Sequence, residues 1–195
     1  MTAEPVVVRT ARPQEAAEIA WLAALTFPLA CPEGTPVATM AAHVGAHLTP
    51  AHFAAWSGSA EHVLLVAESG DDSGSPVSPV SLVGYTLLAV GEPAGPDELA
   101  ALRSAVGPGP YVELSKIYVH PDHLGHGTAG RMLTTATSEA QRLAPGRPFW
   151  LGTNGQNARA QSFYRRHGFT VIGRRTYDVG GVQHDDVVML QAPAE

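Results

Sequence analysis

The chain has 195 residues, of which 45% are hydrophobic, so its length and composition predict one domain with a sizeable core. The net charge of −6 argues against a dedicated nucleic-acid-binding protein, since such proteins usually present a basic face. The chain has no apolar run of about 18 residues, no signal-peptide pattern, one cysteine and no zinc motif, so we expect a cytoplasmic protein without membrane span, disulfide or metal site.

The first half of the chain alternates strand and helix patterns. Apolar runs predict strands over residues 6–9, 62–68 and 80–90. Apolar residues at helical spacing predict helices over 14–27, 36–47 and 50–56, and a short helix over 96–106. Pro28 and Pro32 end the first helix, and Thr49 before Pro50 predicts an N-cap. Residues 69–79 are rich in Gly, Ser, Asp and Pro and predict a loop.

The second half continues the same alternation. It predicts strands over residues 111–119, 148–153, 169–177 and 182–190, with helices over 126–143 and 157–167. Residues 179–181 predict a hairpin turn between the last two strands. Because the strands on either side of residues 91–110 would lack sheet partners alone, we predict one α/β domain over residues 1–195.

A glycine-rich turn follows the strand that ends at Val119. Residues 120–131 are His-Pro-Asp-His-Leu-Gly-His-Gly-Thr-Ala-Gly-Arg, and a turn of this kind at a helix N-terminus suits a phosphate group. A P-loop would need a lysine after Gly127, which is absent. The dinucleotide fingerprint Gly-x-Gly-x-x-Gly matches, but the acid expected about twenty residues later is absent. A helix start that is merely rich in glycine is the remaining alternative.

The same turn resembles the signature of the GNAT acetyltransferase superfamily, Gln/Arg-x-x-Gly-x-Gly/Ala after a strand that ends in Val-x-Pro. Here Val119-His120-Pro121 precedes Leu124-Gly-His-Gly-Thr-Ala129, with leucine in place of the usual Gln or Arg. The segment from Asn157 to Phe169 resembles the family's second motif, Asn-x-x-Ala-x-x-Phe/Leu-Tyr-x-x-x-Gly-Phe. The resemblance covers about residues 80–190.

The resemblance implies a GNAT-like α/β domain, with a central mixed, mostly antiparallel sheet of about seven strands that is flanked by helices and splayed between strands four and five. It implies acetyl-CoA as cosubstrate, bound by motifs within residues 111–169, and no metal. The implied cofactor-binding residues are Ile117, Tyr118 and Val119 for the pantetheine arm, Leu124, Gly125, His126, Gly127, Thr128 and Ala129 for the pyrophosphate, and Asn157, Ala160 and Phe163 on the far side.

Two residues are candidates for proton transfer. Tyr164 occupies the position of the family's general acid, with a core tyrosine as the alternative. Glu113 is the only acid of the strand predicted over 111–119 and is the candidate base, with an ion pair to Lys116 or an arginine as the alternative. His120 titrates near neutral pH but lies in the turn. Because Cys31 is far from any base in sequence, we expect direct transfer in a ternary complex.

The acceptor is predicted from weaker signals. His184, Asp185 and Asp186 begin the last strand and either face the acceptor or are ordinary hairpin residues. The segments Glu113-Leu-Ser-Lys-Ile-Tyr-Val, Trp150-Leu-Gly and His184-Asp-Asp-Val-Val-Met resemble bacterial polyamine acetyltransferases of the GNAT type. Residues 1–102 hold eleven acids and two bases, whereas residues 103–195 hold seven acids and ten bases. An acidic first half would suit a cationic acceptor, and the basic half carries both cofactor motifs.

The sequence therefore predicts an acetyl-CoA-dependent N-acetyltransferase that acts on a primary amine of a small molecule, with polyamines as one candidate class. A protein N-terminus or lysine as acceptor, and a non-catalytic acyl-CoA-binding or sensor domain, are the alternatives. We expect no nucleic-acid or membrane partner, and a homodimer is one option for the assembly.

Overall fold

The computed structural model describes residues 6–32, 34–70, 81–179 and 182–192. Seven strands form a sheet in the order β1-β2-β3-β4-β5-β7-β6. The strands are β1 Val6–Thr10, β2 His62–Ser69, β3 Ser81–Gly91, β4 Tyr111–Val119, β5 Phe149–Asn154, β6 Phe169–Val179 and β7 Val182–Gln191. The helices are α1 Ala16–Ala30, α2 Val37–His47, α3 Pro50–Ser57, α4 Pro96–Val106, α5 Thr128–Leu143 and α6 Ala158–Arg166. The predicted α/β class with a seven-stranded mixed sheet is confirmed.

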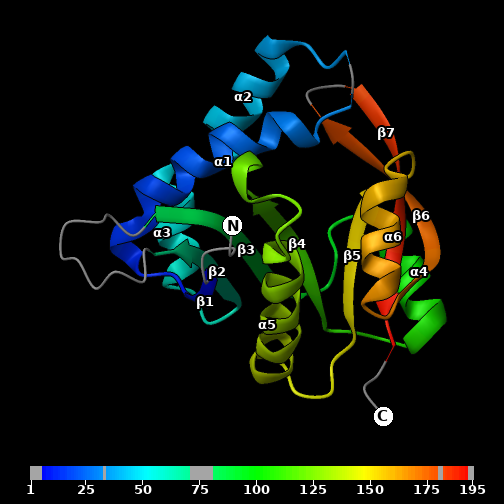
Figure 1. Cartoon of the computed structure of the whole chain (residues 1–195). Coiled ribbons are helices and arrows are strands. Elements are labelled where there is room, and N and C mark those ends of the chain that lie inside the picture. The colour runs from blue at the N-terminus through cyan, green and yellow to red at the C-terminus, as the bar shows by residue number, and fades with distance from the viewer. Residues whose placement is uncertain (1–5, 33, 71–80, 180–181, 193–195) are drawn as a thin grey trace. The chain divides into compact units, whose positions relative to one another are not determined.

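Strand directions agree with the expected mixed, mostly antiparallel sheet. β4 and β5 are parallel, whereas the pairs β1–β2, β5–β7 and β6–β7 are antiparallel. Figure 1 shows β6 and β7 side by side as the C-terminal hairpin. The predicted hairpin turn includes residues 180–181, which lie outside the described residues, as does most of the predicted loop over 69–79.

The chain forms two compact units, and each is described by itself. The first comprises residues 1–87 and 116–139, and the second comprises residues 88–115 and 140–195. Their boundaries fall inside β3, β4 and α5. The assignment of residues 1–195 to one domain stays a prediction. None of the helices in the described residues has the length and apolar character needed to cross a membrane.

In the first unit, helices cover both faces of the strands. Phe53 of α3 and Tyr85 of β3 belong to one buried cluster, which Tyr118 of β4 also contacts. Met132 of α5 belongs to a second cluster, which Ile117 and Val119 of β4 contact. Because neighbouring residues of a strand point to opposite faces, Tyr118 faces α1 and α3, and Ile117 faces α5.

Helix α1 extends beyond its predicted end. Pro28 was expected to terminate it, but α1 continues to Ala30. The proline lies in the last turn, where its missing N–H removes only the hydrogen bond to the Ala24 carbonyl, and two residues of the helix follow it. The Cys31 N–H donates to the Pro28 carbonyl, 3.3 Å away, and closes the helix.

In the second unit, the β5-β7-β6 part of the sheet carries a helix on each face. Leu102 of α4 packs with Trp150 and Val188 in one buried cluster. On the other face, Tyr164 of α6 contacts Phe169, with ring centroids 5.9 Å apart. Glycine permits the close approach of α4, because a Cβ at Gly173 of β6 would lie 2.6 Å from the Cβ of Ala101.

Candidate active site

The parallel pairing of β4 with β5 is short. The ladder pairs Val112 with Phe149 and Glu113 with Trp150, and both strands continue beyond it. The Val112 N–H also donates to the carbonyl of Pro148, 2.9 Å away, just before β5 begins. A ladder of this length between strands four and five agrees with the separation that the family resemblance implied.

The glycine-rich turn lies between β4 and α5, and Figure 1 shows how closely it precedes the helix. His120 anchors its start, because its N–H donates to the Val83 carbonyl at 2.8 Å. Gly125 and Gly127 both have φ +84°, and a Cβ added to either would meet nothing within 4 Å. Glycine is therefore favoured at both positions because of the backbone conformation, and not because a side chain would clash with a neighbour. The surrounding space is open to a ligand.

The donors of this turn match a phosphate group. Of the hydrogen bonds in the described chain, none joins the N–H groups of Gly125, His126 and Gly127 to a backbone carbonyl. Thr128, the first residue of α5, is 1% exposed, and its Oγ1 has no hydrogen-bond partner among the described residues. Exposed N–H groups beside an orphaned hydroxyl at a helix N-terminus are the chemistry that holds a phosphate ester.

Leu124 differs from this pattern. The residue is 43% exposed, and its N–H donates to the Pro121 carbonyl at 3.1 Å. The family resemblance placed Leu124 among the residues that bind the pyrophosphate. Its N–H is used inside the turn, so the backbone donors that are left for a phosphate are those of the three residues that follow it.

In the second unit, α6 carries the residues of the second motif. Asn157 caps the helix, since its Oδ1 accepts a hydrogen bond from the Ala160 N–H at 2.9 Å. Phe163 and Tyr164 contact each other with ring centroids 5.3 Å apart. Burial raises the pKa of Tyr164 to about 12. Its hydroxyl therefore stays protonated throughout the neutral range and acts as a hydrogen-bond donor.

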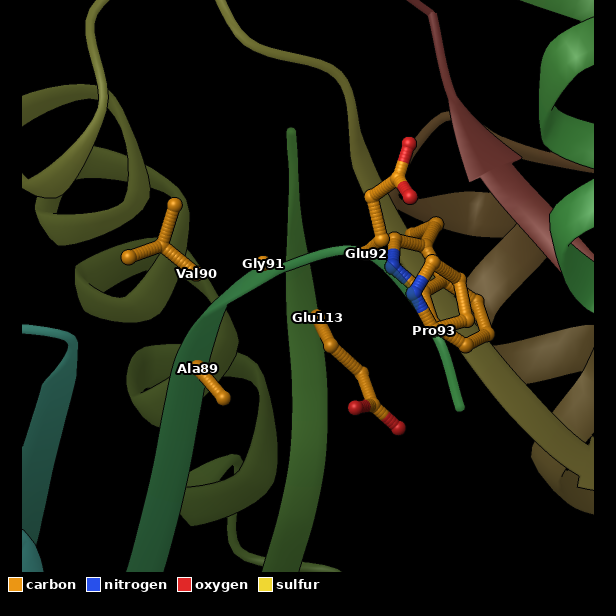
Figure 2. Close-up of a pocket in the computed structure, with 7 residues that line it drawn as sticks. Ala89, Val90, Gly91, Glu92, Pro93 and Glu113 are labelled. Carbon is orange, nitrogen blue, oxygen red and sulfur yellow. The ribbon is translucent and has the colours of Figure 1, made fainter. Parts of the chain in front are cut away.

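Glu113 lines a small hollow of the second unit. The hollow encloses ≈ 90 Å³ between the end of β3, the loop that follows it, Glu113 and Trp150. Figure 2 shows the Glu113 side chain projecting from β4, with its carboxylate directed away from that of Glu92. A half-buried carboxylate beside an indole ring is a suitable place for an ammonium or amine group.

The polar residues at the start of β7 are not equivalent. Asp186 is 7% exposed, and it accepts a hydrogen bond from Nη2 of Arg175 at 3.4 Å. Arg175 also reaches Glu98 of α4 at 3.5 Å and lies over the Trp150 ring, 5.9 Å from its centroid. Burial raises the pKa of Asp186, whereas Arg175 acts in the opposite direction. Asp186 thus holds the mostly buried side chain of Arg175 in place inside the second unit.

The other two residues of this group differ from Asp186. Asp185 is exposed, and its carbonyl accepts a hydrogen bond from the Gly155 N–H at 2.8 Å. His184 is half-buried, close enough to Asp186 to act on its charge. Contact of these residues with an acceptor stays a prediction.

Sequence reasoning missed Arg175 and its partner Glu98. One signal was present, because Gly152 is an isolated glycine inside a predicted strand, a pattern that marks close approach by another group. A Cβ at Gly152 would lie 2.3 Å from Cζ of Arg175. The guanidinium therefore lies directly against the backbone of β5.

Comparisons with known proteins define the class of this chain. A family model described as the acetyltransferase (GNAT) family matches residues 4–169. An uncharacterized N-acetyltransferase of Mycobacterium tuberculosis (strain ATCC 25618 / H37Rv) is 32% identical over 177 residues, covering 91% of this chain and 97% of the relative. An uncharacterized N-acetyltransferase of Mycobacterium bovis matches over the same length at the same identity.

Solved structures share the fold. The PaiA N-acetyltransferase of Thermoplasma acidophilum, in complex with coenzyme A, has a TM-score of 0.68 at 14% identity, covering 96% of this chain and 98% of its own. Arabidopsis thaliana NAA60, in complex with a bisubstrate analogue, has a TM-score of 0.69 at 16% identity with the same coverage. The chain belongs to the GNAT family of acetyltransferases. The predicted fold class and the enzyme class of acyltransferases are thereby confirmed.

Proposed function

We propose that the protein transfers the acetyl group of acetyl-CoA to a primary amine of a small molecule, by direct attack in a ternary complex. The observation that carries this proposal is the turn before α5. Its two glycines have left-handed backbone conformations, the N–H groups of residues 125–127 make no hydrogen bond to a backbone carbonyl among the described residues, and the buried hydroxyl of Thr128 has no hydrogen-bond partner there. The related structure from Thermoplasma acidophilum holds coenzyme A on the same fold.

The first unit supplies the residues that would hold the cosubstrate. Backbone groups of Ile117, Tyr118 and Val119 would pair with the pantetheine arm, and the turn from Leu124 to Ala129 would take the pyrophosphate. Bound there, acetyl-CoA supplies an activated thioester carbonyl. In the second unit, the family resemblance assigns Asn157, Ala160 and Phe163 to the cosubstrate, and the Asn157 side chain also caps α6.

Two residues of the second unit would act on the reacting groups. An amine that becomes an amide loses one proton, and Glu113 would accept it directly or through water. The departing sulfur needs stabilisation as negative charge develops on it. Because a thiol, with a pKa of about 8.5, is a stronger acid than Tyr164, complete proton transfer from the phenol is uphill. Tyr164 would therefore act through a hydrogen bond to sulfur that strengthens as the C–S bond breaks.

The surroundings of Cys31 favour direct transfer over transfer through an acetylated cysteine. Burial raises the pKa of its thiol, and Sγ contacts the Phe27 carbonyl oxygen at 3.5 Å. An acetylated cysteine intermediate would need a thiolate, which this environment disfavours. Initial velocities measured over both substrates should accordingly give intersecting double-reciprocal lines, and parallel lines would contradict the ternary complex.

The role of Tyr164 is tested with a matched pair of variants. Tyr164→Phe should lower kcat by roughly 100-fold while the affinity for coenzyme A, measured by calorimetry, stays the same. Tyr111→Phe is the control, because this buried hydroxyl donates to the Gly107 carbonyl at 2.6 Å within the same unit. Its removal should reduce stability and leave kcat near that of the parent. An unaltered kcat in Tyr164→Phe would refute the assignment.

Thiol release from acetyl-CoA with a panel of amines separates an enzyme from an acyl-CoA-binding or sensor domain. Amine-dependent release supports the proposal. Binding of coenzyme A without release by any amine, including polyamines, peptide N-termini and lysine peptides, would favour the sensor.

A further inference from the structure

Aromatic and basic side chains gather on one face of the first unit. We call this set the Lys116 cluster, and it consists of Phe27 of α1, His43 and His47 of α2, Trp56 of α3 and Lys116 of β4. Nζ of Lys116 lies 5.1 Å from the centroid of the Trp56 ring. Phe27 and His43 are stacked, with centroids 4.4 Å apart and planes inclined by 6°, and His43 lies 4.8 Å from His47.

Charge effects connect the two parts of the cluster. Burial lowers the pKa of His43, and the charges of His47 and Lys116 lower it further. Burial and the charge of Lys116 also lower the pKa of His62 of β2, whereas Glu61 raises it. At neutral pH the cluster therefore combines the ammonium group of Lys116 with the neutral imidazole of His43 and with flat rings.

The cluster is accessible to a small molecule. Phe27, His43, Trp56 and Lys116 are half-buried, and His47 is exposed. Lys116 directly precedes Ile117, whose backbone would pair with the pantetheine arm. A small molecule on the face of α1 and α3 beside Lys116 would therefore lie next to the cosubstrate within this unit.

Three carboxylates of this unit are held by other groups. Glu15 and Glu68 both accept hydrogen bonds from Arg9, and Glu18 accepts one from the Leu82 N–H at 3.4 Å. Glu61 of the same unit is exposed and acts on the charge of His62. Of the other acids of residues 1–102, Glu92, Asp97 and Glu98 belong to the second unit, and Glu4, Glu33, Asp71 and Asp72 lie outside the described residues. The acidic composition of the first half, which favoured a cationic acceptor, is therefore shared between the two units.

We propose that the Lys116 cluster binds an anionic group, a carboxylate or a phosphoryl group, on the acceptor, so that the acceptor is an amine that also carries a negative charge. The ammonium of Lys116 and the imidazole N–H groups would pair with the anion, and the Trp56 and Phe27 rings would contact the apolar part of the molecule. This inference rests on the proposed acetyl transfer and names its substrate class. Polyamines, which are wholly cationic, would be poor acceptors.

Matched pairs of amines test the proposal. Phenylalanine against phenethylamine, and tryptophan against tryptamine, differ by a carboxylate, while phosphoethanolamine against ethanolamine differs by a phosphoryl group. With the complete protein and acetyl-CoA, kcat/KM should be at least about tenfold higher for the anionic member of one kind of pair, which also identifies the anion. Equal values within every pair, or faster turnover of spermidine, would overturn the proposal.

Variants of Lys116 separate anion recognition from a structural role. Lys116→Met should reduce kcat/KM for the member that carries the carboxylate or phosphoryl group about tenfold more than for the member that lacks it. Lys116→Arg should restore most of the difference. Arg12→Met, an exposed base of the same unit, is the control and should keep the parent's ratio. Equal losses for both members in Lys116→Met would mean that the lysine only supports the fold.

A binding measurement distinguishes failure of this inference from failure of the proposed function. Calorimetry with coenzyme A present should show the anionic member binding more tightly, in a manner that depends on Lys116. Such binding without turnover would uphold the inference and refute the acetyl transfer. Turnover that favours the partner without the anionic group would refute the inference and uphold the acetyl transfer. Absence of both binding and turnover would overturn both.

Discussion

Gly127→Ala tests whether the left-handed backbone of the turn before α5 is needed to bind coenzyme A. At φ +84° an L-residue is strained by about 1–2 kcal/mol, and this is the whole cost here because a Cβ would meet nothing within 4 Å. The exposed turn can relax to relieve the strain, but it then loses the conformation that directs its N–H groups at phosphate. The dissociation constant for coenzyme A should therefore rise roughly 5–30-fold.

Gly146→Ala is the matched control for this change. Gly146 has φ +72° with equally open surroundings, and it follows the other end of α5. The helix between them has 16 residues and is therefore about 24 Å long. Calorimetric titration should show parent-like affinity in Gly146→Ala, while thermal unfolding shows a comparable loss of stability. Unchanged coenzyme A affinity in Gly127→Ala would refute the role given to the turn.

Three further changes test the remaining assignments. Glu113→Gln should lower kcat by about 100-fold or more with little effect on coenzyme A binding, and steady-state rates near those of the parent would remove it as the base. Asn157→Ala should cost about 0.5–2 kcal/mol in thermal unfolding because the Ala160 N–H loses its cap, while Asn157→Ser should cost less; equal stability of all three proteins would contradict capping. Arg9 holds the pKa of Glu15 below its usual value. The pair therefore stabilises the fold fully at pH values above the usual pKa of a glutamate, and this contribution is lost as the pH falls through the lowered pKa. Urea unfolding should accordingly show a larger loss of stability from Arg9→Met at pH 7 than at pH 3, and equal losses would show that the ion pair contributes nothing.

The order and type of the elements could be predicted from sequence because each has a clear period or a clear breaker. The helix predicted over 50–56 is an example, since Thr49 accepts a hydrogen bond from the His52 N–H and Pro50 fills the first turn. Element ends were less predictable. The helix predicted from residue 126 begins at Thr128, because Gly127 adopts a left-handed conformation that a right-handed helix does not contain.

The candidate site was predictable only where it is local in sequence. The turn before α5 and the position of Tyr164 each lie within one short motif. The ion pairs of Arg175 depend on the register that places it opposite Asp186, and on the approach of α4. The Lys116 cluster brings together side chains from α1, α2, α3 and β4, and no spacing along the chain indicates that these elements meet.

The placement of Lys116 over Trp56 makes the cluster unusually easy to observe by chemical labelling. Lys116 is the only lysine in the chain, so an amine-selective acylating reagent has one side-chain target. The extent of its modification, read by mass spectrometry, reports directly on how accessible this one ammonium group is. A ligand that covers it would slow the labelling, and modification of Nζ would change the surroundings of the neighbouring indole and hence its fluorescence. Occupancy of this face can therefore be followed without turnover and without introducing a foreign residue.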